Sequence, residues 1–233
     1  MHLFDSHSES YEADIREAIP FAHLEPAFFA QVKAESLLEI VTRELGATDR
    51  LAALDVGCGP GTTHGLLLSH FGALYGADVS ERMIERARRE HPDVTYVVFD
   101  GEALPFASAT FDVTFAVCVL HHVPPLQWVR FIDELQRVTR PGGLIAIYEH
   151  NPANPLTRLV ISRCAFDEGA VLVSRRRAQN LLIHAGMAPG PSGYILFFPW
   201  PGRITRGIER RLRWLRLGAQ YFVTGRAHDG GRA

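Results

Sequence analysis

The segment LDVGCGPGT, residues 54–62, constrains the fold more than any other part of the chain. It follows an apolar run of strand length and precedes a helical pattern, so it predicts a strand, a glycine turn and a helix in succession. Glycine permits tight backbone conformations and lets the main chain approach a ligand closely. The unpaired amides that begin the following helix favour a carboxylate or a phosphate. The segment therefore predicts a site for a cofactor that carries a nucleoside.

Acidic residues at the ends of the next two predicted strands indicate which cofactor this is. Asp78 is placed to accept hydrogen bonds from a ribose diol, and Asp100 with Glu102 can accept from an adenine amino group. The dinucleotide pattern G-x-G-x-x-G is incomplete, because Thr62 stands at its third glycine. The added acids would also repel a pyrophosphate. Charge therefore favours a cationic sulfonium cofactor, and an NAD(P)-dependent oxidoreductase is the alternative.

Five motifs together resemble the class I S-adenosylmethionine-dependent methyltransferases. LDVGCGPGT, GADVS, FDGEALPF, FDVTFAVCVLHHV and RVTRPGGLIAIYEH occur over residues 50–150 in the order and at the spacing of that family. The resemblance implies S-adenosylmethionine as cofactor and S-adenosylhomocysteine as product, with the methionyl part on the glycine turn. Asp55 would orient the turn or the cofactor's amino group, or only cap the glycine loop. The residues expected to bind the cofactor are Asp55, Gly57, Cys58, Gly59, Gly61, Asp78, Val79, Asp100, Gly101, Glu102, Cys118 and Val119.

Strands that alternate with helices predict an α/β fold with a mostly parallel sheet, helices on both faces, and ligands at the carboxyl ends of the strands. The resemblance adds a doubly wound, Rossmann-like sheet of seven strands in the order 3-2-1-4-5-7-6, with strand 7 antiparallel. We expect an N-terminal helical lid in 1–48, the methyltransferase domain in 49–225 and a disordered tail in 226–233. Within the domain, 151–173 and 199–217 are expected to be substrate-side insertions.

Punctuating residues predict several boundaries. A helix is expected over 25–45, and Ser80 is expected to cap the next long helix. Pro141-Gly142-Gly143 is expected to end a helix before a short strand at 144–148. A sixth strand is expected at 194–198.

Histidines follow the fourth and fifth predicted strands, where an acceptor would lie. Methyl transfer to a hydroxyl requires an aligned acceptor and removal of its proton, and histidine suits that role. His150 is the preferred base. His122 is the second candidate, although LHHVP-like endings occur in the family across different reactions, so a structural or cofactor-contacting role is the alternative. Glu149 is the third catalytic candidate: it would orient a histidine from another segment, or only anchor the following loop with His150.

The insertion 151–173 is too long for a plain connection, so we expect it to form part of the acceptor pocket. EHNPANPLT and RCAFDEGA resemble a subset of bacterial methyltransferases from polysaccharide and secondary-metabolite gene clusters. The acceptor is expected to be a small molecule or glycan, methylated at oxygen; N- or C-methylation and a non-catalytic cofactor-binding protein are alternatives. No metal is expected, because no evident His/Asp ligand cluster stands in these stretches. The residues expected to bind the acceptor are Tyr11, His121, Asn151, Arg158, Arg163 and Asp167.

Charge divides the chain unevenly: residues 151–233 hold 13 of the 24 basic side chains but 4 of the 26 acidic ones. A basic helix is expected over 204–217. It either packs on the domain with its basic face in solvent, docks to an anionic membrane, or forms a dimer contact. Nucleic acid is not an expected partner, because the cofactor half is acidic. Three cysteines without metal-binding spacing and a polar N-terminus favour a cytoplasmic protein, as a monomer or homodimer.

Overall fold

The computed structural model describes residues 26–164, 167, 169–199 and 202–228. The strands of this part are β1 Ala52–Val56, β2 Ala73–Asp78, β3 Thr95–Val98, β4 Phe111–Val117, β5 Thr139–His150, β6 Ala188–Ile195 and β7 Gln220–Arg226. The helices are α3 Pro26–Leu45, α4 His64–Leu67, α5 Glu81–Glu90, the 3-10 helix η1 Pro125–Gln127, α6 Trp128–Val138, α7 Pro155–Ile161, α8 Arg175–His184 and α9 Arg203–Leu212.

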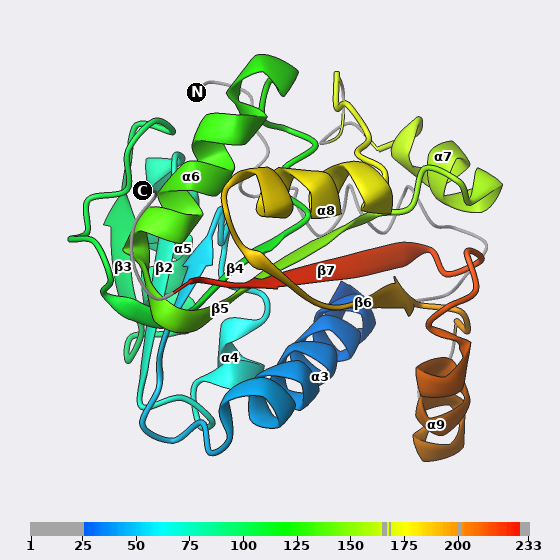
Figure 1. Ribbon diagram of the computed structural model, residues 1–233, viewed down its shortest axis with the longest axis horizontal. Helices are drawn as coiled ribbons and strands as arrows, with labels where there is room; N and C mark the ends of the chain where they lie inside the picture. The colour runs from blue at the N-terminus through cyan, green and yellow to red at the C-terminus, as the bar shows by residue number, and fades with distance from the viewer. Residues whose placement is uncertain (1–25, 165–166, 168, 200–201, 229–233) are drawn as a thin grey trace.

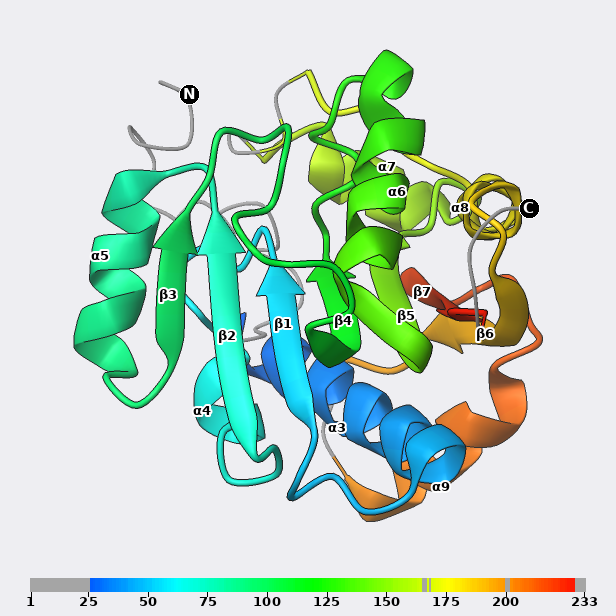
Figure 2. The same cartoon turned by 60° about the vertical axis from the view of Figure 1, so that its left-hand side comes forward.

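These strands form one sheet in the order β3-β2-β1-β4-β5-β7-β6 (Figures 1 and 2). The pairs from β3 to β5 are parallel, and β7 runs antiparallel to both β5 and β6. The predicted strand order and the reversed seventh strand are thus confirmed. The carboxyl ends of β1, β2, β4 and β5 meet at one edge of the sheet, together with the first residues of β7.

Helices cover both faces of the sheet (Figure 2), and the continuous burial of β5 from residue 143 to 149 reflects this. Leu144, Ala146 and Tyr148 face a core that α3 completes, whereas Ile145 and Ile147 face a core that α6 and α8 complete. All five residues are fully buried. A strand covered on both faces reads as a continuous apolar run rather than an alternating one, which is why its sequence shows no period of two.

Ser80 caps α5 as its sequence predicts. Its hydroxyl accepts a hydrogen bond from the Met83 amide at 3.2 Å, and a cap of this kind stabilises a helix by about 1 kcal/mol. Met83, Ile84 and Ala87 form the buried side of the helix. The cap places the start of α5 directly after Asp78, at the edge where the site lies.

Two predicted boundaries were wrong. Pro141-Gly142-Gly143 does not separate α6 from a short strand, because β5 already begins at Thr139 and runs through this tripeptide. Gly142 has a φ of +73°, and the pairing with β4 shifts register between Phe111 and Val113, so the tripeptide forms an irregularity within the strand. The sixth strand lies at 188–195 rather than 194–198, since its pairing with β7 begins at Ala188.

The N-terminal helix and the basic helix contact each other. Residues 1–25 lie outside the described part of the chain, and α3 packs on the sheet as one layer of the domain. Arg213, directly after α9, donates two hydrogen bonds to Glu39 of α3, and Arg206 of α9 pairs with Glu35. Part of the positive face of α9 is therefore neutralised by α3. Among the described residues no helix combines the length and the apolar character that crossing a membrane requires.

Candidate active site

The glycine turn is held against the end of β2. The amides of Gly57 and Cys58 donate to the carbonyl of Ala77 at 2.7 and 3.1 Å. Gly57 has a φ of +74°, and a Cβ atom there would lie 2.5 Å from the Val119 Cγ2 atom. Both constraints require glycine at this position. The turn and the loop after β4 therefore form a narrow wall, to which the predicted cofactor residues Cys58, Val119 and Gly57 all belong.

Asp55 lies beneath this turn and has an unused oxygen. Its Oδ2 accepts a hydrogen bond from His64 Nε2 at 3.1 Å, and His64 Nδ1 lies 2.6 Å from the Tyr96 hydroxyl. Its Oδ1 is buried without a hydrogen-bond partner in the described part of the chain. A buried polar atom without a partner is destabilising unless a ligand satisfies it. The ammonium group of S-adenosylmethionine would supply such a partner, so these residues fit the cofactor.

His64 and Tyr96 were not predicted from the sequence to belong to the site. His64 falls in a short helical pattern that gave no reason to single it out, and Tyr96 lies in an edge strand. Only the packing of α4 over β1 and β3 brings them behind Asp55. Burial raises the pKa of the Tyr96 hydroxyl above its ordinary value, so this hydroxyl remains a hydrogen-bond donor.

Asp78 supports the turn directly. Its Oδ2 accepts from the Gly59 amide at 2.8 Å and its Oδ1 from the Ser80 amide at 2.9 Å. Burial raises the pKa of this carboxyl, against the lowering effect of the two amides. Each carboxylate oxygen can accept a further hydrogen bond. Asp78 can therefore hold the turn and still bind a ribose diol.

The residues expected near adenine lie at an exposed rim. Asp100 Oδ1 accepts from the amides of Glu102 and Ala103 at 2.8 and 3.0 Å, and these bonds lower the pKa of its carboxyl. Glu102 is exposed and pairs with Arg130 at 3.2 Å. Gly101 lies beside Val79, since a Cβ atom on it would meet Val79 Cγ1 at 3.4 Å. The Asp100 carboxylate thus stabilises the loop that follows it. Contact of Val79, Asp100, Gly101 and Glu102 with a cofactor stays a prediction.

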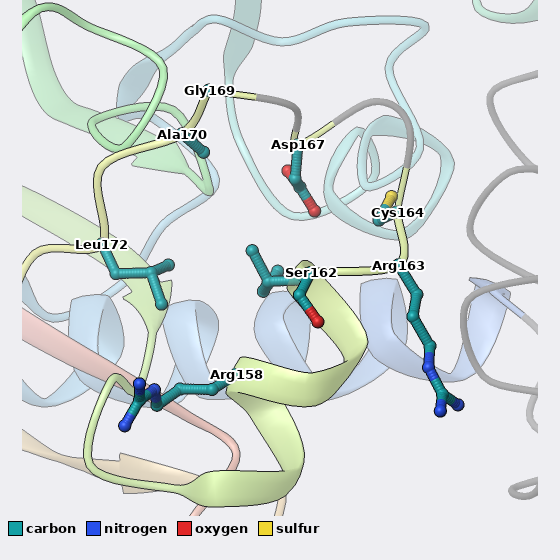
Figure 3. Close-up of a pocket in the computed structure, with 9 residues that line it drawn as sticks. Arg158, Ser162, Arg163, Cys164, Asp167, Gly169, Ala170 and Leu172 are labelled. Carbon is teal, nitrogen blue, oxygen red and sulfur yellow. The ribbon is translucent and has the colours of Figure 1, made fainter.

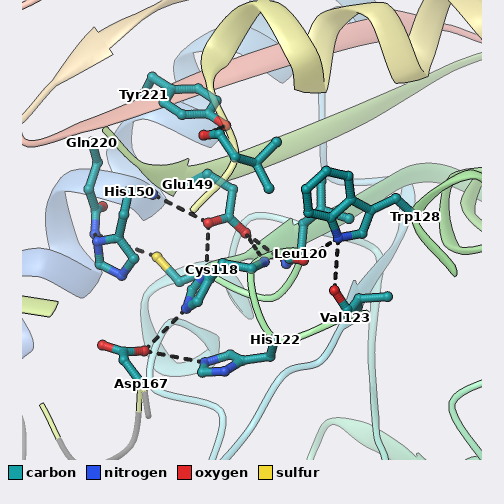
Figure 4. A network of polar contacts seen from close by, with 12 residues as sticks. Cys118, Leu120, His122, Val123, Trp128, Glu149, His150, Asp167, Gln220 and Tyr221 are labelled. Atoms are coloured by element: carbon teal, nitrogen blue, oxygen red, sulfur yellow. Dashed lines mark hydrogen bonds and ion pairs between the residues drawn. The ribbon is translucent and has the colours of Figure 1, made fainter. Parts of the chain in front are cut away.

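A network of buried acids and histidines lies at the ends of β4 and β5 (Figure 4). Glu149 is fully buried, and its Oε1 accepts from the Leu120 amide at 2.7 Å. Its Oε2 lies 2.6 Å from His121 Nδ1. Glu149 therefore holds a histidine from another segment, which is one of the roles that the sequence left open.

His121 lies between two carboxylates. Its Nε2 is 3.2 Å from Asp167 Oδ1, on the far side of the ring from Glu149. Burial lowers the pKa of His121, but Glu149 and Asp167 outweigh burial and raise it well above its ordinary value. Burial would likewise raise the pKa of Glu149, yet the facing His121 keeps it below its usual value. His121 thus joins β4, β5 and the insertion rather than facing solvent.

His122 and His150 stand beside this pair. His122 Nε2 lies 3.4 Å from the same Asp167 oxygen. His150 Nδ1 lies 3.4 Å from the Gln220 Nε2 atom, on the strand paired with β5. Burial lowers the pKa of both histidines to about 4. Both rings are therefore neutral at neutral pH, and a base this weak is better suited to positioning a hydroxyl than to deprotonating it unaided.

Within the described residues, the premise for expecting no metal was wrong. His121, His150 and Asp167 each offer a ligand atom, and these atoms all lie within 4.8 Å of one another. The three residues are far apart in the sequence, so spacing alone gave no indication of the cluster.

A cavity of about 550 Å³ adjoins this network through Asp167 (Figure 3). Arg158, Arg163 and Cys164 line it together with other residues of the insertion. The two arginine side chains extend in different directions (Figure 3), so they do not converge on one point. The insertion thus forms a pocket, and the role of its arginines in binding an acceptor stays a prediction.

Asn151 and Tyr11 were also expected to bind the acceptor. Asn151 is 2% exposed, its amide donates to the carbonyls of Arg216 and Gly218, and its oxygen accepts from the Ala153 amide. These bonds make it an anchor of the insertion, and its geometry does not support acceptor contact. Tyr11 lies outside the described residues.

A doubly wound sheet with a glycine turn, acids and a pocket at its carboxyl edge defines a nucleoside-cofactor-binding α/β protein. Comparison with known proteins specifies the class. Residues 54–147 match the model of the methyltransferase domain family. Over 97% of its length the chain superimposes on 99% of an S-adenosylmethionine-dependent methyltransferase from Thermotoga maritima, with a TM-score of 0.67 and 19% identity. Residues 54–147 thus belong to the methyltransferase domain family, within a class I S-adenosylmethionine-dependent methyltransferase fold.

Curated relatives differ in their acceptors. The chain is 30% identical over 189 residues to a 2-methyl-6-phytyl-1,4-hydroquinone methyltransferase from Synechocystis, covering 73% of this chain and 58% of the relative. It is 40% identical over 110 residues to a 27-O-demethylrifamycin SV methyltransferase from Amycolatopsis mediterranei, covering 44% and 39%. The chain spans about half the length of the first curated relatives it matches.

Proposed function

We propose that this chain transfers a methyl group from S-adenosylmethionine to a hydroxyl of a small-molecule or glycan-type acceptor. The observation that carries the proposal is the unpartnered Asp55 oxygen under the glycine turn, at the same sheet edge as the histidine network. A relative named for O-methylation of a secondary metabolite supports oxygen as the acceptor atom. N- or C-methylation is the alternative.

Each part of the site has a distinct role in this proposal. When bound, the cofactor supplies a methyl group that is already activated by its sulfonium. Asp55 and Asp78 hold its charged and polar ends, and the glycine turn lets the main chain approach it closely. Alignment of the acceptor can contribute several kcal/mol. The neutral ring of His122 accepts a hydrogen bond from the acceptor hydroxyl and orients its oxygen, and the hydroxyl proton passes to solvent on transfer. Asp167 fixes the insertion against His121.

Calorimetric titration with S-adenosylhomocysteine tests the cofactor, with NAD and NADP as alternatives. We expect binding of S-adenosylhomocysteine alone, and weaker binding by Asp55→Asn. An amide nitrogen at the Oδ1 position would face the ligand ammonium, and loss of such a charged hydrogen bond costs about 1.5–3 kcal/mol, or roughly tenfold to a hundredfold in Kd. Exposed Asp49→Asn, before β1, makes the same change at the opposite edge and should leave Kd unchanged.

Transfer of a labelled methyl group to a panel of phenols, sugars and hydroquinones tests the reaction. His122→Ala should keep S-adenosylhomocysteine binding while it lowers turnover, because the ring orients the acceptor only. A chain that binds the cofactor but methylates no acceptor in the panel would favour the non-catalytic alternative. Binding of NAD in place of S-adenosylhomocysteine would overturn the proposal.

A further inference from the structure

We propose that His121, His150 and Asp167 form a binding site for a divalent transition-metal ion at the acceptor side of the domain. The ligands come from the loop after β4, the end of β5 and the insertion. Two imidazoles and one carboxylate suit zinc, iron(II) or manganese(II) better than calcium or magnesium. The site itself stands on geometry, and only its role in catalysis rests on the proposed function.

Distances within the cluster are close to those of a coordination sphere. Ligand atoms about 2.0–2.2 Å from a tetrahedral ion lie roughly 3.3–3.6 Å from one another. His121 Nε2 and Asp167 Oδ1 are already 3.2 Å apart, and His122 Nε2 lies 3.4 Å from the same oxygen. His121, His150 and Asp167 each offer one ligand atom, and these three atoms lie within 4.8 Å of one another. A shift of one ligand atom by about an ångström would therefore bring all three to the separations of a tetrahedral site.

The first independent observation is the carboxylate that holds the Nδ1 atom of His121. Histidines that ligate metals almost always donate their other ring N–H to a carboxylate or a carbonyl, which fixes the tautomer and the ring. Glu149 Oε2 is 2.6 Å from His121 Nδ1, and both side chains are fully buried. This arrangement presents Nε2 toward Asp167 and His150.

The second observation is a buried oxygen beside His150. Gln220 is 6% exposed, and its Oε1 has no hydrogen-bond partner among the described residues, while its Nε2 faces His150 Nδ1 at 3.4 Å. Turning the amide by half a rotation would let Oε1 accept from His150 Nδ1–H. His150 Nε2 would then offer a lone pair to the cluster. The ring nitrogen that does not bind the ion would then donate to an oxygen in both histidines, to Glu149 Oε2 from His121 and to Gln220 Oε1 from His150.

The occupied site would deepen the proposed function. A bound divalent ion lowers the pKa of a coordinated hydroxyl or water and orients it. An acceptor hydroxyl on the ion would give up its proton to solvent near neutral pH. The acceptor would then be a hydroxylated compound that reaches the ion through the pocket of the insertion.

Titration of the full chain with cobalt(II) tests the site, because cobalt(II) bound to nitrogen ligands in a tetrahedral geometry absorbs visible light. We expect one cobalt ion per chain with these bands, and competition by zinc. Asp167→Asn and His150→Ala should each weaken cobalt binding at least a hundredfold. Gln220→Leu should weaken it about tenfold to a hundredfold, as loss of a residue behind a ligand does. Exposed His70→Ala, at the opposite edge before β2, is the matched control and should bind as the parent does.

Absence of cobalt binding by the parent chain would overturn the site, as would binding that Asp167→Asn and His150→Ala leave unchanged. Circular dichroism of each variant shows whether a loss reflects unfolding, and Asp167→Asn keeps the side-chain shape. S-adenosylhomocysteine titration of the same samples separates the two proposals. Cofactor binding without cobalt binding removes the metal site alone, whereas cobalt binding without cofactor binding removes the methyltransferase proposal alone.

Discussion

The carboxyl edge of the sheet has two parts that are built differently. After the roles proposed for them, we call the ends of β1 to β3 the cofactor edge and the ends of β4 and β5 the acceptor edge. At the cofactor edge Asp55 meets His64 across 9 residues and Gly59 meets Asp78 across 19. At the acceptor edge His121 meets Glu149 across 28 residues and Asp167 across 46, and Gln220 meets His150 across 70. Except for the contact of His64 with Tyr96 across 32 residues, these contacts of the first edge span fewer residues than those of the second, which pair side chains from distant segments.

The charges follow the same division. The acids of the cofactor edge are satisfied largely by backbone amides, as Asp78 and Asp100 show. The acids of the acceptor edge pair with histidine rings. Amide contacts are fixed by the turn itself, whereas ring contacts depend on how distant segments pack. We therefore expect the acceptor edge to be more sensitive to loss of a single charge.

Glu149→Gln should have the largest effect on stability. The change leaves the shape of the side chain but removes the charge that faces His121, and breaking a buried pair costs about 3–5 kcal/mol. Urea unfolding followed by circular dichroism measures the free energy of unfolding. Glu39→Gln, which loses a partly exposed pair with Arg213, should cost no more than about 1 kcal/mol. Equal losses in the two variants would contradict the view that burial makes the acceptor edge sensitive.

Gly57→Ala should have the next largest effect, and it tests the cofactor edge. The new Cβ would lie 2.5 Å from Val119 Cγ2 at a φ of +74°. Overpacking adds about 1–3 kcal/mol to the cost of a left-handed conformation. Gly59→Ala is the matched control, because Gly59 also has a positive φ but nothing lies within 4 Å of its Cβ position. Thermal unfolding and S-adenosylhomocysteine titration should both show the greater loss at Gly57. Equal losses of stability and of binding in the two variants would show that Val119 moves aside, so that the glycine turn and the loop after β4 do not form a rigid wall.

Glu134→Gln should have the smallest effect, and it depends on pH. Glu134 accepts from the Leu104 amide, and Arg137 donates to the carbonyls of Leu104 and Phe106, so this pair braces the loop beside Asp100. The hydrogen bond from Arg137 lowers the pKa of Glu134 below its ordinary value of 4.5. A carboxyl with a lowered folded-state pKa contributes stability above its ordinary pKa, and this contribution is lost as pH falls through the folded-state value.

The expected difference from the parent is about 0.5 kcal/mol near pH 7, shrinking toward zero as pH falls below 4.5. Urea unfolding at several pH values measures it. Exposed Glu85→Gln makes the same change without a bracing contact and should match the parent at every pH. A difference that persists at low pH would show that the effect comes from shape rather than charge.

Prediction from sequence was most accurate where a local rule operates. The Ser80 cap, the glycine turn and the strand order all lie where short motifs or the family resemblance placed them. The start of β5 was missed because Pro141-Gly142-Gly143 predicts a break locally, while β4 pairs with β5 on both sides of the tripeptide, at Thr139 and from Leu144 onward. His64, Tyr96 and Gln220 were missed because nothing in their immediate sequence distinguishes them.

The order of the sheet was predicted from the family resemblance, whereas the amino-acid sequence by itself determined the glycine turn and the acids that follow the strands. Short-range backbone conformation fixes those features, and a few glycines, caps and apolar runs specify it. Only the tertiary structure decided which acid faces which histidine. Glu149 could have anchored its own loop, and it holds His121 instead because β4 and β5 end side by side. The pairing of His121, His150 and Asp167 likewise depends on burial of three distant segments at one edge, and no local pattern records that contact.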